Sequence, residues 1–410
     1  QHYLQTSLRI LNIAFVALYN LKDVKKGSGT YHHIYQELCS QNHNVTAIGP
    51  LDIRFPFFTR LFRFITKRIL LKKYFSYLDP FVGLNIGRAV QKQLKGQDFD
   101  IMLTNDYAIA GYSKLKIPIV LWTDSIFPFN YSSNIHPWLK NMSWFSIKFY
   151  HIVVKAGLKN ISLCIVPGRW HYQEILKYNL IKRDLLSIIP FGANMKDPGE
   201  FTGRLKNIKH LETKSINILF VGKDFKLKRL DFAIKVIEEL QKVGVNAFLN
   251  IVGGKKPEYE KLKDIKKINI NLITKFHGLI HKDNDEGLIK LSKLYKKSDI
   301  LLLPSAAEGF GIVYVEAAAY GIPSLGFKTT GVNTAVKNGE SGILLDIDKG
   351  PSEFTNIILS WIKNPNEYKK LCIGARLHYE NNGNWPILIK RFNSYIENKL
   401  NILKKDIKEI

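Results

Sequence analysis

The chain has 410 residues, of which 46% are hydrophobic and 12% aromatic, so it can build full cores and is not a disordered chain. Its length exceeds what one hydrophobic core usually serves, which predicts two domains. Sixty Lys and Arg against 35 Asp and Glu give a formal net charge of +25. We therefore expect a surface that attracts anions, such as phosphorylated ligands, anionic lipid or nucleic acid.

The cysteines and the apolar runs indicate the cellular compartment of the protein. Cys39, Cys164 and Cys372 are far apart and follow no metal-ligand spacing, so neither a disulfide framework nor a zinc site is predicted. No run of 18 apolar residues occurs, and the first residues lack the order of a signal peptide. We expect a cytoplasmic protein.

Short apolar runs alternate with helical patterns through the first half of the chain. This alternation predicts a parallel sheet with crossover helices on both faces. The expected strands lie at residues 13–17, 45–48, 101–103, 117–121 and 163–166.

A glycine-rich loop follows the first expected strand. It contains Gly27 and Gly29 and precedes a helical pattern at residues 31–38. A Gly-x-Gly alone is weak support for a phosphate site, because many tight turns contain one.

Residues 54–75 have the most unusual composition of the chain. Basic residues recur there at helical spacing, and apolar residues do the same. They are Arg60, Arg63 and Lys67 in the first set, and Leu61, Phe64 and Ile65 in the second. This pattern is typical of a helix at an anionic membrane surface, and equally of a core helix with basic edges. The sequence leaves both interpretations open, and with them a peripheral location on the inner face of the membrane.

After a polar, Gly- and Lys-rich linker at residues 193–214, the alternation of strands and helices begins again. The expected strands of this second half are 216–221, 247–252, 270–273, 300–303, 324–327 and 342–345. A last helical pattern covers roughly residues 385–399. The sequence therefore predicts two successive doubly wound α/β halves.

The segment from Pro304 to Pro323 carries the strongest functional signal. A buried strand, a glycine turn and a helix follow one another, so unpaired N–H groups at the helix start suit a phosphate. Glu308 and Glu316 lie eight residues apart in the same segment. Carboxylates repel an anion, so beside an anion site they are expected to bind hydroxyls. A nucleotide sugar carries both phosphate groups and hydroxyls.

This segment resembles the Glu-x7-Glu signature of the retaining glycosyltransferases of family 4, which adopt the GT-B fold. That resemblance implies two Rossmann-like domains facing each other across a cleft. It places an acceptor-binding domain at residues 1–192, the linker at 193–214 and a nucleotide-sugar-binding domain at 215–384. The helix at 385–410 is expected to cross back onto the first domain.

The resemblance also implies roles for individual residues of the signature. Glu308 corresponds to the acid beside the donor sugar, and Glu316 to the acid that holds the ribose hydroxyls. The backbone amides of Gly309, Phe310 and Gly311 correspond to those that line the sugar and phosphate pocket.

Other positions match the family less closely. Lys223 and Lys228 correspond to the cations at the donor diphosphate, although the family usually has Arg where Lys223 stands, and an ammonium cannot bind bidentately. Gly278 lies in the landmark near the nucleobase, and the Gly27 and Gly29 loop corresponds to the one beside phosphates and acceptor. Asp124 stands where many members have a His, and the resemblance implies that it orients an acceptor hydroxyl or a donor-sugar hydroxyl. Residues 330–334 lack the acid of the usual Gly-Gly-x-Pro-Glu motif.

The resemblance thus implies a retaining glycosyltransferase of the hexosyltransferase type, with a UDP-sugar as the favoured donor. The expected acceptor is a hydroxyl of a glycan or lipid-linked molecule in bacterial cell-surface polysaccharide or glycoconjugate synthesis. No cofactor and no metal are expected, because the Asp-x-Asp pairs at residues 98–100, 283–285 and 346–348 lie at element boundaries. Nucleic acid is not the expected partner.

The alternatives are a GT-B sugar epimerase or phosphorylase, and a non-enzymatic basic module that binds membrane or nucleic acid. The first differs from a transferase in giving product without an acceptor. The second rests on the net charge alone.

Overall fold

The computed structural model describes residues 9–126, 141–199, 201, 215–265 and 272–408. These residues divide into two compact units. Unit 1 comprises the described residues within 1–189 and 385–410, and unit 2 comprises those within 190–384. The linker expected at 193–214 belongs to unit 2 where it is described.

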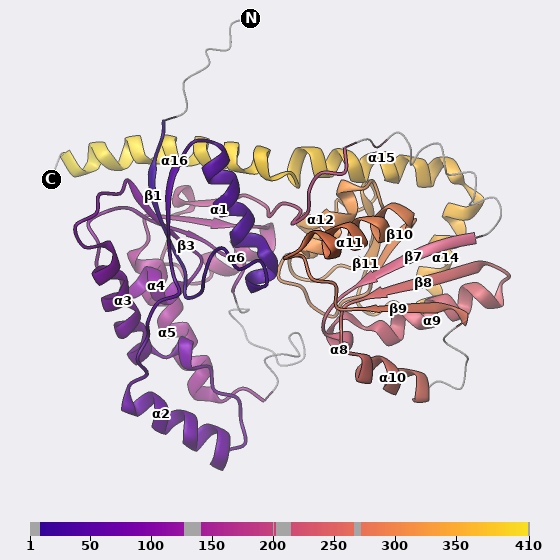
Figure 1. Ribbon diagram of the computed structural model, residues 1–410, viewed down its shortest axis with the longest axis horizontal. Helices are drawn as coiled ribbons and strands as arrows, with labels where there is room; N and C mark the ends of the chain where they lie inside the picture. Colours follow the sequence, from indigo (N-terminus) through magenta and orange to yellow (C-terminus); the bar gives the residue numbers. More distant parts are fainter. Residues whose placement is uncertain (1–8, 127–140, 200, 202–214, 266–271, 409–410) are drawn as a thin grey trace, which may run out of the picture. The chain divides into compact units, whose positions relative to one another are not determined.

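Unit 1 is built on a six-stranded sheet in the order β2-β1-β3-β4-β5-β6, and every pair of neighbours is parallel (Figure 1). The strands are β1 (Asn12–Val16), β2 (Asn44–Ile48), β3 (Ile101–Thr104), β4 (Ile119–Trp122), β5 (Leu163–Val166) and β6 (Leu186–Ile188). Every residue of β3, β4 and β5 is buried, because helices cover both faces of the sheet. The chain passes from β1 to β2 on one side and then to β3 on the other, so the strand order reverses between β1 and β3.

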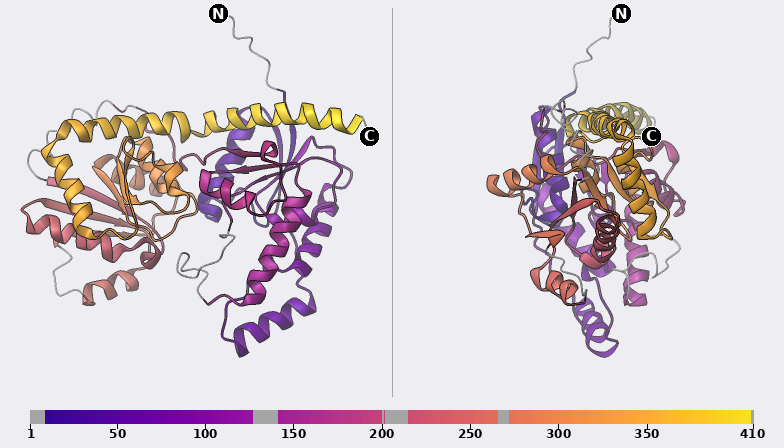
Figure 2. Two further views of the ribbon diagram at one scale, coloured as in Figure 1. Left: turned by 180° about the vertical axis from the view of Figure 1, so that it is seen from behind. Right: turned by 90° about the vertical axis from the view of Figure 1, so that its right-hand side faces the viewer.

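The helices of unit 1 connect and cover these strands, except α2, which lies away from the sheet (Figures 1 and 2). They are α1 (Thr30–Ser40), α2 (Phe57–Phe64), α3 (Pro80–Leu94), α4 (Tyr107–Tyr112), α5 (Trp144–Asn160), α6 (Arg169–Leu176) and α16 (Trp385–Lys408). A π-helical turn at Ile65–Ile69 continues α2, and short 3₁₀ turns occur at Lys26–Gly29, Ser76–Leu78 and Arg183–Leu185.

Unit 2 repeats this plan with a second parallel sheet, in the order β12-β11-β10-β7-β8-β9. Its strands are β7 (Ser215–Val221), β8 (Asn246–Val252), β9 (Thr274–Gly278), β10 (Ile300–Leu303), β11 (Ser324–Phe327) and β12 (Gly342–Leu345). Its helices are α8 (Phe225–Lys228), α9 (Leu230–Lys242), α10 (Lys256–Ile265), α11 (Asp285–Lys297), α12 (Ile312–Ala319), α13 (Val332–Ala335), α14 (Pro351–Lys363) and α15 (Pro365–Asn382). The strand order reverses between β7 and β10.

The strand expected at residues 270–273 was placed too early. Residues 270 and 271 lie outside the described residues, and the strand β9 begins at Thr274. β9 is an edge strand that pairs only with β8, and most of its side chains are partly exposed. Such a strand lacks the continuous apolar run by which buried strands are recognised.

The long helix α16 packs against the sheet and helices of unit 1. The indole of Trp122, at the end of β4, stacks on Phe392 with the ring centroids 5.5 Å apart, and lies edge-on to Trp385. His43 and Asn393, both buried, form a hydrogen bond of 2.9 Å. The C-terminal helix therefore completes the core behind β4.

Replacing Phe392 with Ala should lower the free energy of unfolding by about 3–5 kcal/mol, because the truncation leaves a cavity beside the buried Trp122. Urea denaturation measures the change, and Lys390→Ala on the exposed face of the same helix is the matched control. If both variants were equally stable, α16 would not form part of the unit 1 core.

Candidate functional site

The candidate site of unit 2 lies where the strand order reverses. Parallel α/β sheets bind ligands at the carboxyl ends of their strands, at such a reversal. β7 and β10 are the two strands at this point, and the segments after them are 222–228 and 304–311. The amide of Ala306 donates to the carbonyl of Leu227 at 2.9 Å, so the two segments are directly joined.

An ion pair connects these segments through their side chains. The ammonium of Lys228 lies 2.6 Å from a carboxylate oxygen of Glu308, and only 18% and 8% of the two side chains are exposed. The hydroxyl of Thr330 donates to the carbonyl of Glu308 and accepts from its amide, which fixes the backbone at this residue. The sequence assigned Lys228 to phosphate and Glu308 to sugar, and in the structure the two are neighbours.

The start of α12 faces the same edge of the sheet. Gly311 caps the helix with φ +93°, a left-handed conformation that side chains rarely adopt. A Cβ there would also lie 2.7 Å from the ring of Tyr314. The side chain of Phe310 is buried against Phe191, so residues 309–311 can offer a ligand only their backbone groups. Their amides and the first turn of α12 suit an anion.

Glu316 lies one turn into α12 and is fully buried. The hydroxyl of Tyr295, on α11, donates to one carboxylate oxygen at 3.0 Å. The ammonium of Lys282, in the loop between β9 and α11, pairs with the other oxygen. Lys282 is partly exposed, so the carboxylate can exchange this cation for the hydroxyls of a ligand without leaving its position.

Two further candidates lie at the same edge of unit 2. Lys223 is exposed in the turn after β7, so its ammonium is accessible to a ligand. Gly278 ends β9 with φ +69°, and no atom lies within 4 Å of the position that a Cβ would take. The backbone at Gly278 therefore borders open space, as contact with a flat base would require.

The candidates of unit 1 form a separate group after β1 and β4. Asp124 follows β4, and the hydroxyl of Tyr31 lies 3.5 Å from its carboxylate, at the limit of a hydrogen bond. The loop with Gly27 and Gly29 leads into α1, which carries Tyr31. Gly27 has φ +53°, and a Cβ would come within 3.2 Å of both Tyr31 and Tyr19. The structure thus brings Gly27, Gly29 and Asp124 to one edge of the unit 1 sheet.

Burial alters the acidity of this group. It raises the pKa of the Asp124 carboxyl, and hydrogen bonds from its own amide and from Tyr31 offset only part of that effect. Burial also raises the pKa of the Tyr31 hydroxyl well above its usual value, with the charge of Asp124 acting in the same direction. Asp124 is therefore a carboxyl that binds its proton more tightly than a solvated one.

Metal ligands do not gather in the part of the chain that the structure describes. No group of three His, Cys, Asp or Glu side chains there could hold a metal ion. The residues that converge after β7 and β10 carry the ammonium of Lys228, the carboxylate of Glu308 that pairs with it, and backbone amides, of which the ammonium and the amides suit an anion directly.

Comparison with known proteins identifies the architecture. Residues 202–378 match the family model described as glycosyl transferases group 1, a range that includes every candidate of unit 2. An uncharacterized glycosyltransferase of Haemophilus influenzae is 34% identical over 175 residues, which cover 42% of this chain and 46% of that protein. The chain spans about half the length of the curated relatives it matches.

Solved structures align over nearly the whole chain. HepE of Anabaena in complex with UDP-glucose has a TM-score of 0.63 at 16% identity, covering 95% of this chain and 100% of that chain. WaaG, a glycosyltransferase involved in lipopolysaccharide biosynthesis, has a TM-score of 0.60 at 15% identity, covering 92% and 98%. The fold is GT-B. Two Rossmann-like domains, as predicted from the sequence, are confirmed as the architecture.

Several residues at the GT-B candidate sites were not found by sequence analysis. Lys282 and Tyr295 contact Glu316, and Thr330 holds Glu308. In unit 1, the amide of Asn105 donates to the hydroxyl of Tyr19 at 3.2 Å, beside the Gly27 loop. Asn105 directly follows β3, which is a usable signal. Lys282 lies in a polar loop and Tyr295 inside a helix, so neither differs in the sequence from an ordinary loop or core residue.

Replacing Lys282 with Met should lower the free energy of unfolding by about 1.5–3 kcal/mol, because a charge-assisted hydrogen bond to a buried carboxylate is lost. Adding Glu316→Gln should restore part of that loss, since the remaining carboxyl is then uncharged. Urea denaturation of the single and double variants measures the coupling. Lys293→Met, exposed on α11, is the control. Additive losses would show that the two side chains do not interact.

The raised pKa of Asp124 predicts a pH-dependent difference in stability. As the pH rises above the usual value of 3.8, the unfolded chain releases the proton first, so the folded protein loses stability until its own carboxyl ionises. Asp124→Asn removes this loss, and its stability relative to the parent protein should increase from about pH 4 upward and then level off. Urea denaturation at several pH values tests this, and parallel curves would contradict it.

Proposed function

We propose that this protein is a retaining glycosyltransferase that moves a sugar from a UDP-sugar to a hydroxyl of a glycan or lipid-linked acceptor. The observation that carries the proposal is the Lys228–Glu308 pair beside the start of α12, within the range that matches glycosyl transferases group 1. A cation, backbone amides and a carboxylate at one point suit a ligand that combines phosphate and sugar. The similarity to HepE, which was solved with UDP-glucose, supports uracil as the base of the donor.

Each group of unit 2 has a role in binding the donor. The ammonium groups of Lys223 and Lys228 and the amides at the start of α12 bind the diphosphate. Glu308 accepts hydrogen bonds from sugar hydroxyls, and Glu316 accepts them from the ribose in place of Lys282. The backbone at Gly278 contacts the base.

The reaction needs no protein nucleophile. The bond between the anomeric carbon and the phosphate oxygen breaks, and the acceptor oxygen bonds to that carbon on the same face of the sugar. The departing phosphate oxygen takes the acceptor proton. Charge grows on the diphosphate as the bond breaks, and the preorganised cations and amides stabilise it there. Lys228 and Lys223 thereby replace the divalent ion that other glycosyltransferases use, so we propose a metal-independent reaction.

The polar group of unit 1 serves the acceptor. Asp124 orients the acceptor hydroxyl, and the Gly27 and Gly29 loop allows close approach of a ligand to the backbone. A lipid-linked acceptor fits a place in cell-surface polysaccharide synthesis at the inner face of the membrane, and the similarity to WaaG supports that setting.

Lys228→Met should lower kcat/KM for sugar transfer by about 10²–10³, because a preorganised charge at the departing group is lost. Glu308→Gln should reduce transfer to a similar extent. The donor is first chosen by thermal shift against UDP-, GDP- and ADP-sugars, since a bound ligand raises the unfolding temperature. Transfer is then measured by product formation, with Lys226→Met, exposed on the same helix, as the control.

Several results would contradict the proposal. Full activity of Lys228→Met would remove the site assignment. A product of inverted anomeric configuration by NMR would exclude retention, and loss of activity with EDTA would exclude metal independence. An isomerised sugar or a sugar phosphate formed without acceptor would identify an epimerase or a phosphorylase instead.

A further inference from the structure

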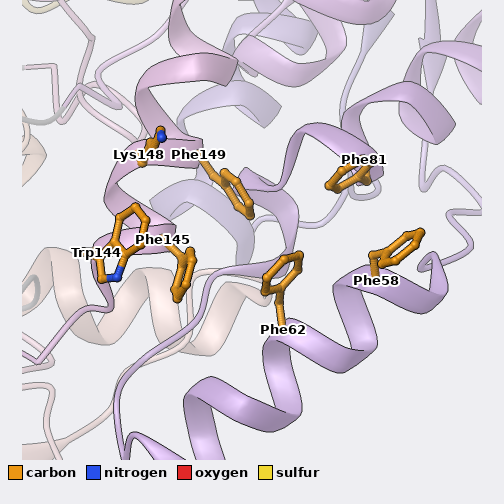
Figure 3. Close-up of a pocket in the computed structure, with 7 residues that line it drawn as sticks. All are labelled: Phe58, Phe62, Phe81, Trp144, Phe145, Lys148 and Phe149. Carbon is orange, nitrogen blue, oxygen red and sulfur yellow. The ribbon is translucent and has the colours of Figure 1, made fainter.

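An aromatic groove opens on the surface of unit 1, away from its sheet. Its volume is about 380 Å³, which lies within the range of ligand pockets (Figure 3). Three helices contribute its lining, which consists of Phe58 and Phe62 from α2, Phe81 from α3, and Trp144, Phe145, Lys148 and Phe149 from α5. Apart from Lys148 and the indole N–H of Trp144, these side chains offer no hydrogen-bonding group.

The apolar surface continues outward from the groove along α2. Phe57 is 72% exposed and Phe64 59%, and the chain that follows α2 exposes Ile69 and Leu71 to a similar extent. In the views of Figures 1 and 2, α2 lies at the end of unit 1 farthest from the sheet. Of the two interpretations that the sequence left open for residues 54–75, the core helix is therefore excluded.

Basic side chains surround this apolar surface. Residues 54–75 contain no Asp or Glu and seven Lys or Arg, all of them exposed. They are Arg54, Arg60, Arg63, Lys67, Arg68, Lys72 and Lys73. Lys148 lies over the ring of Trp144, 5.7 Å from its centroid, at the side of the groove formed by α5. The surface thus combines exposed hydrocarbon with a high density of positive charge.

The helix α2, which carries this surface, packs on its other side against the start of α3 and against α5. The buried hydroxyl of Thr59 donates to the carboxylate of Asp79 at 2.7 Å, and the hydroxyl of Tyr74 donates to the same oxygen at 2.6 Å. Phe62 packs between Phe145 and Phe149, with ring centroids 5.6 and 5.9 Å apart. These contacts hold α2 against α3 and α5, while Phe57 and Phe64 remain exposed.

We propose that this face of unit 1, made of α2, the turn that follows it and the aromatic groove, docks on an anionic lipid bilayer. Acyl chains contact Phe57, Phe64 and the groove, while the surrounding Lys and Arg bind lipid phosphates. Basic residues near an anionic surface and hydrocarbon removed from water both favour binding to such a bilayer. Within the ranges that the structure describes, no helix qualifies as a membrane span.

Lipid fits this face better than a protein or a nucleic acid. The side chains exposed beside α2 include the aliphatic Ile69, Leu70 and Leu71, on which bases cannot stack. An extended peptide laid in the groove would find no hydrogen-bond partners for its backbone N–H and C=O groups among the phenyl rings. Hydrocarbon chains need no such partners, and their phosphate headgroups match the basic rim.

The inference does not depend on the donor site, which lies in unit 2. The full-length protein is mixed with vesicles of phosphatidylcholine alone or of equimolar phosphatidylglycerol and phosphatidylcholine, and the bound fraction is measured by flotation. We expect binding to the anionic vesicles, weakened but not abolished by high salt. Phe57→Ser/Phe64→Ser should lower the partition coefficient at least tenfold, and Arg60→Gln/Arg63→Gln should do the same at low salt.

The matched control is Ile289→Ser/Leu377→Ser, which removes two comparably exposed apolar side chains of unit 2 and should bind like the parent protein. Vesicles with brominated acyl chains should quench tryptophan emission of the parent more than that of Trp144→Phe, which reports contact of chains with the groove. UDP-sugar binding, followed by thermal shift in the same variants, should not change, so failure of docking and failure of the proposed function remain distinguishable.

Three outcomes would overturn the inference. One is the absence of binding to anionic vesicles, and another is equal binding by Phe57→Ser/Phe64→Ser and the parent protein. The third is light scattering that shows a dimer which Phe57→Ser/Phe64→Ser converts to monomer, since the face would then join two copies of the chain.

Discussion

Parallel pairing of all strands is the constraint on which the rest of the structure depends. Each strand must return to the same end of its sheet through a crossover, so every loop that follows a strand collects at one edge. At the reversal between β7 and β10, this rule joins residues eighty positions apart, and Lys228 meets Glu308 there. Lys228, which the proposed function assigns to the diphosphate, and Glu308, which it assigns to the sugar, are neighbours because the sheet is parallel, without any local sequence pattern that links them.

Much of this arrangement could be predicted from the sequence. Central strands such as β4 and β10 are buried on both faces, so they form continuous apolar runs that can be recognised in the sequence. The edge strand β9 was misplaced because its exposed residues mix polar and apolar types. The boundaries of a strand can thus be predicted where the strand is completely buried, and cannot be predicted in this way where the strand faces solvent.

The finer geometry of the site could not be predicted in this way. Tyr295 and Lys282 reach Glu316 from a different helix and loop, and their pairing depends on how α11 packs beside α12. A lysine in a polar loop is indistinguishable from a solvated one until the fold places a buried carboxylate next to it. Similarly, the amphipathic pattern of residues 54–75 is the same for a core helix and a surface helix, and only the packing of Thr59 and Phe62 decides which side is covered.

The position of α16 has a consequence for biosynthesis. Unit 2 is inserted in the sequence between β6 and α16, so the ribosome releases all of unit 2 before the residues that stack on Trp122. Domains usually fold in the order in which they are synthesised. In this protein, α16 is synthesised after all of unit 2, so the indole of Trp122 is uncovered while unit 2 folds. Unit 1 is therefore the first unit to be translated and the last to complete its core.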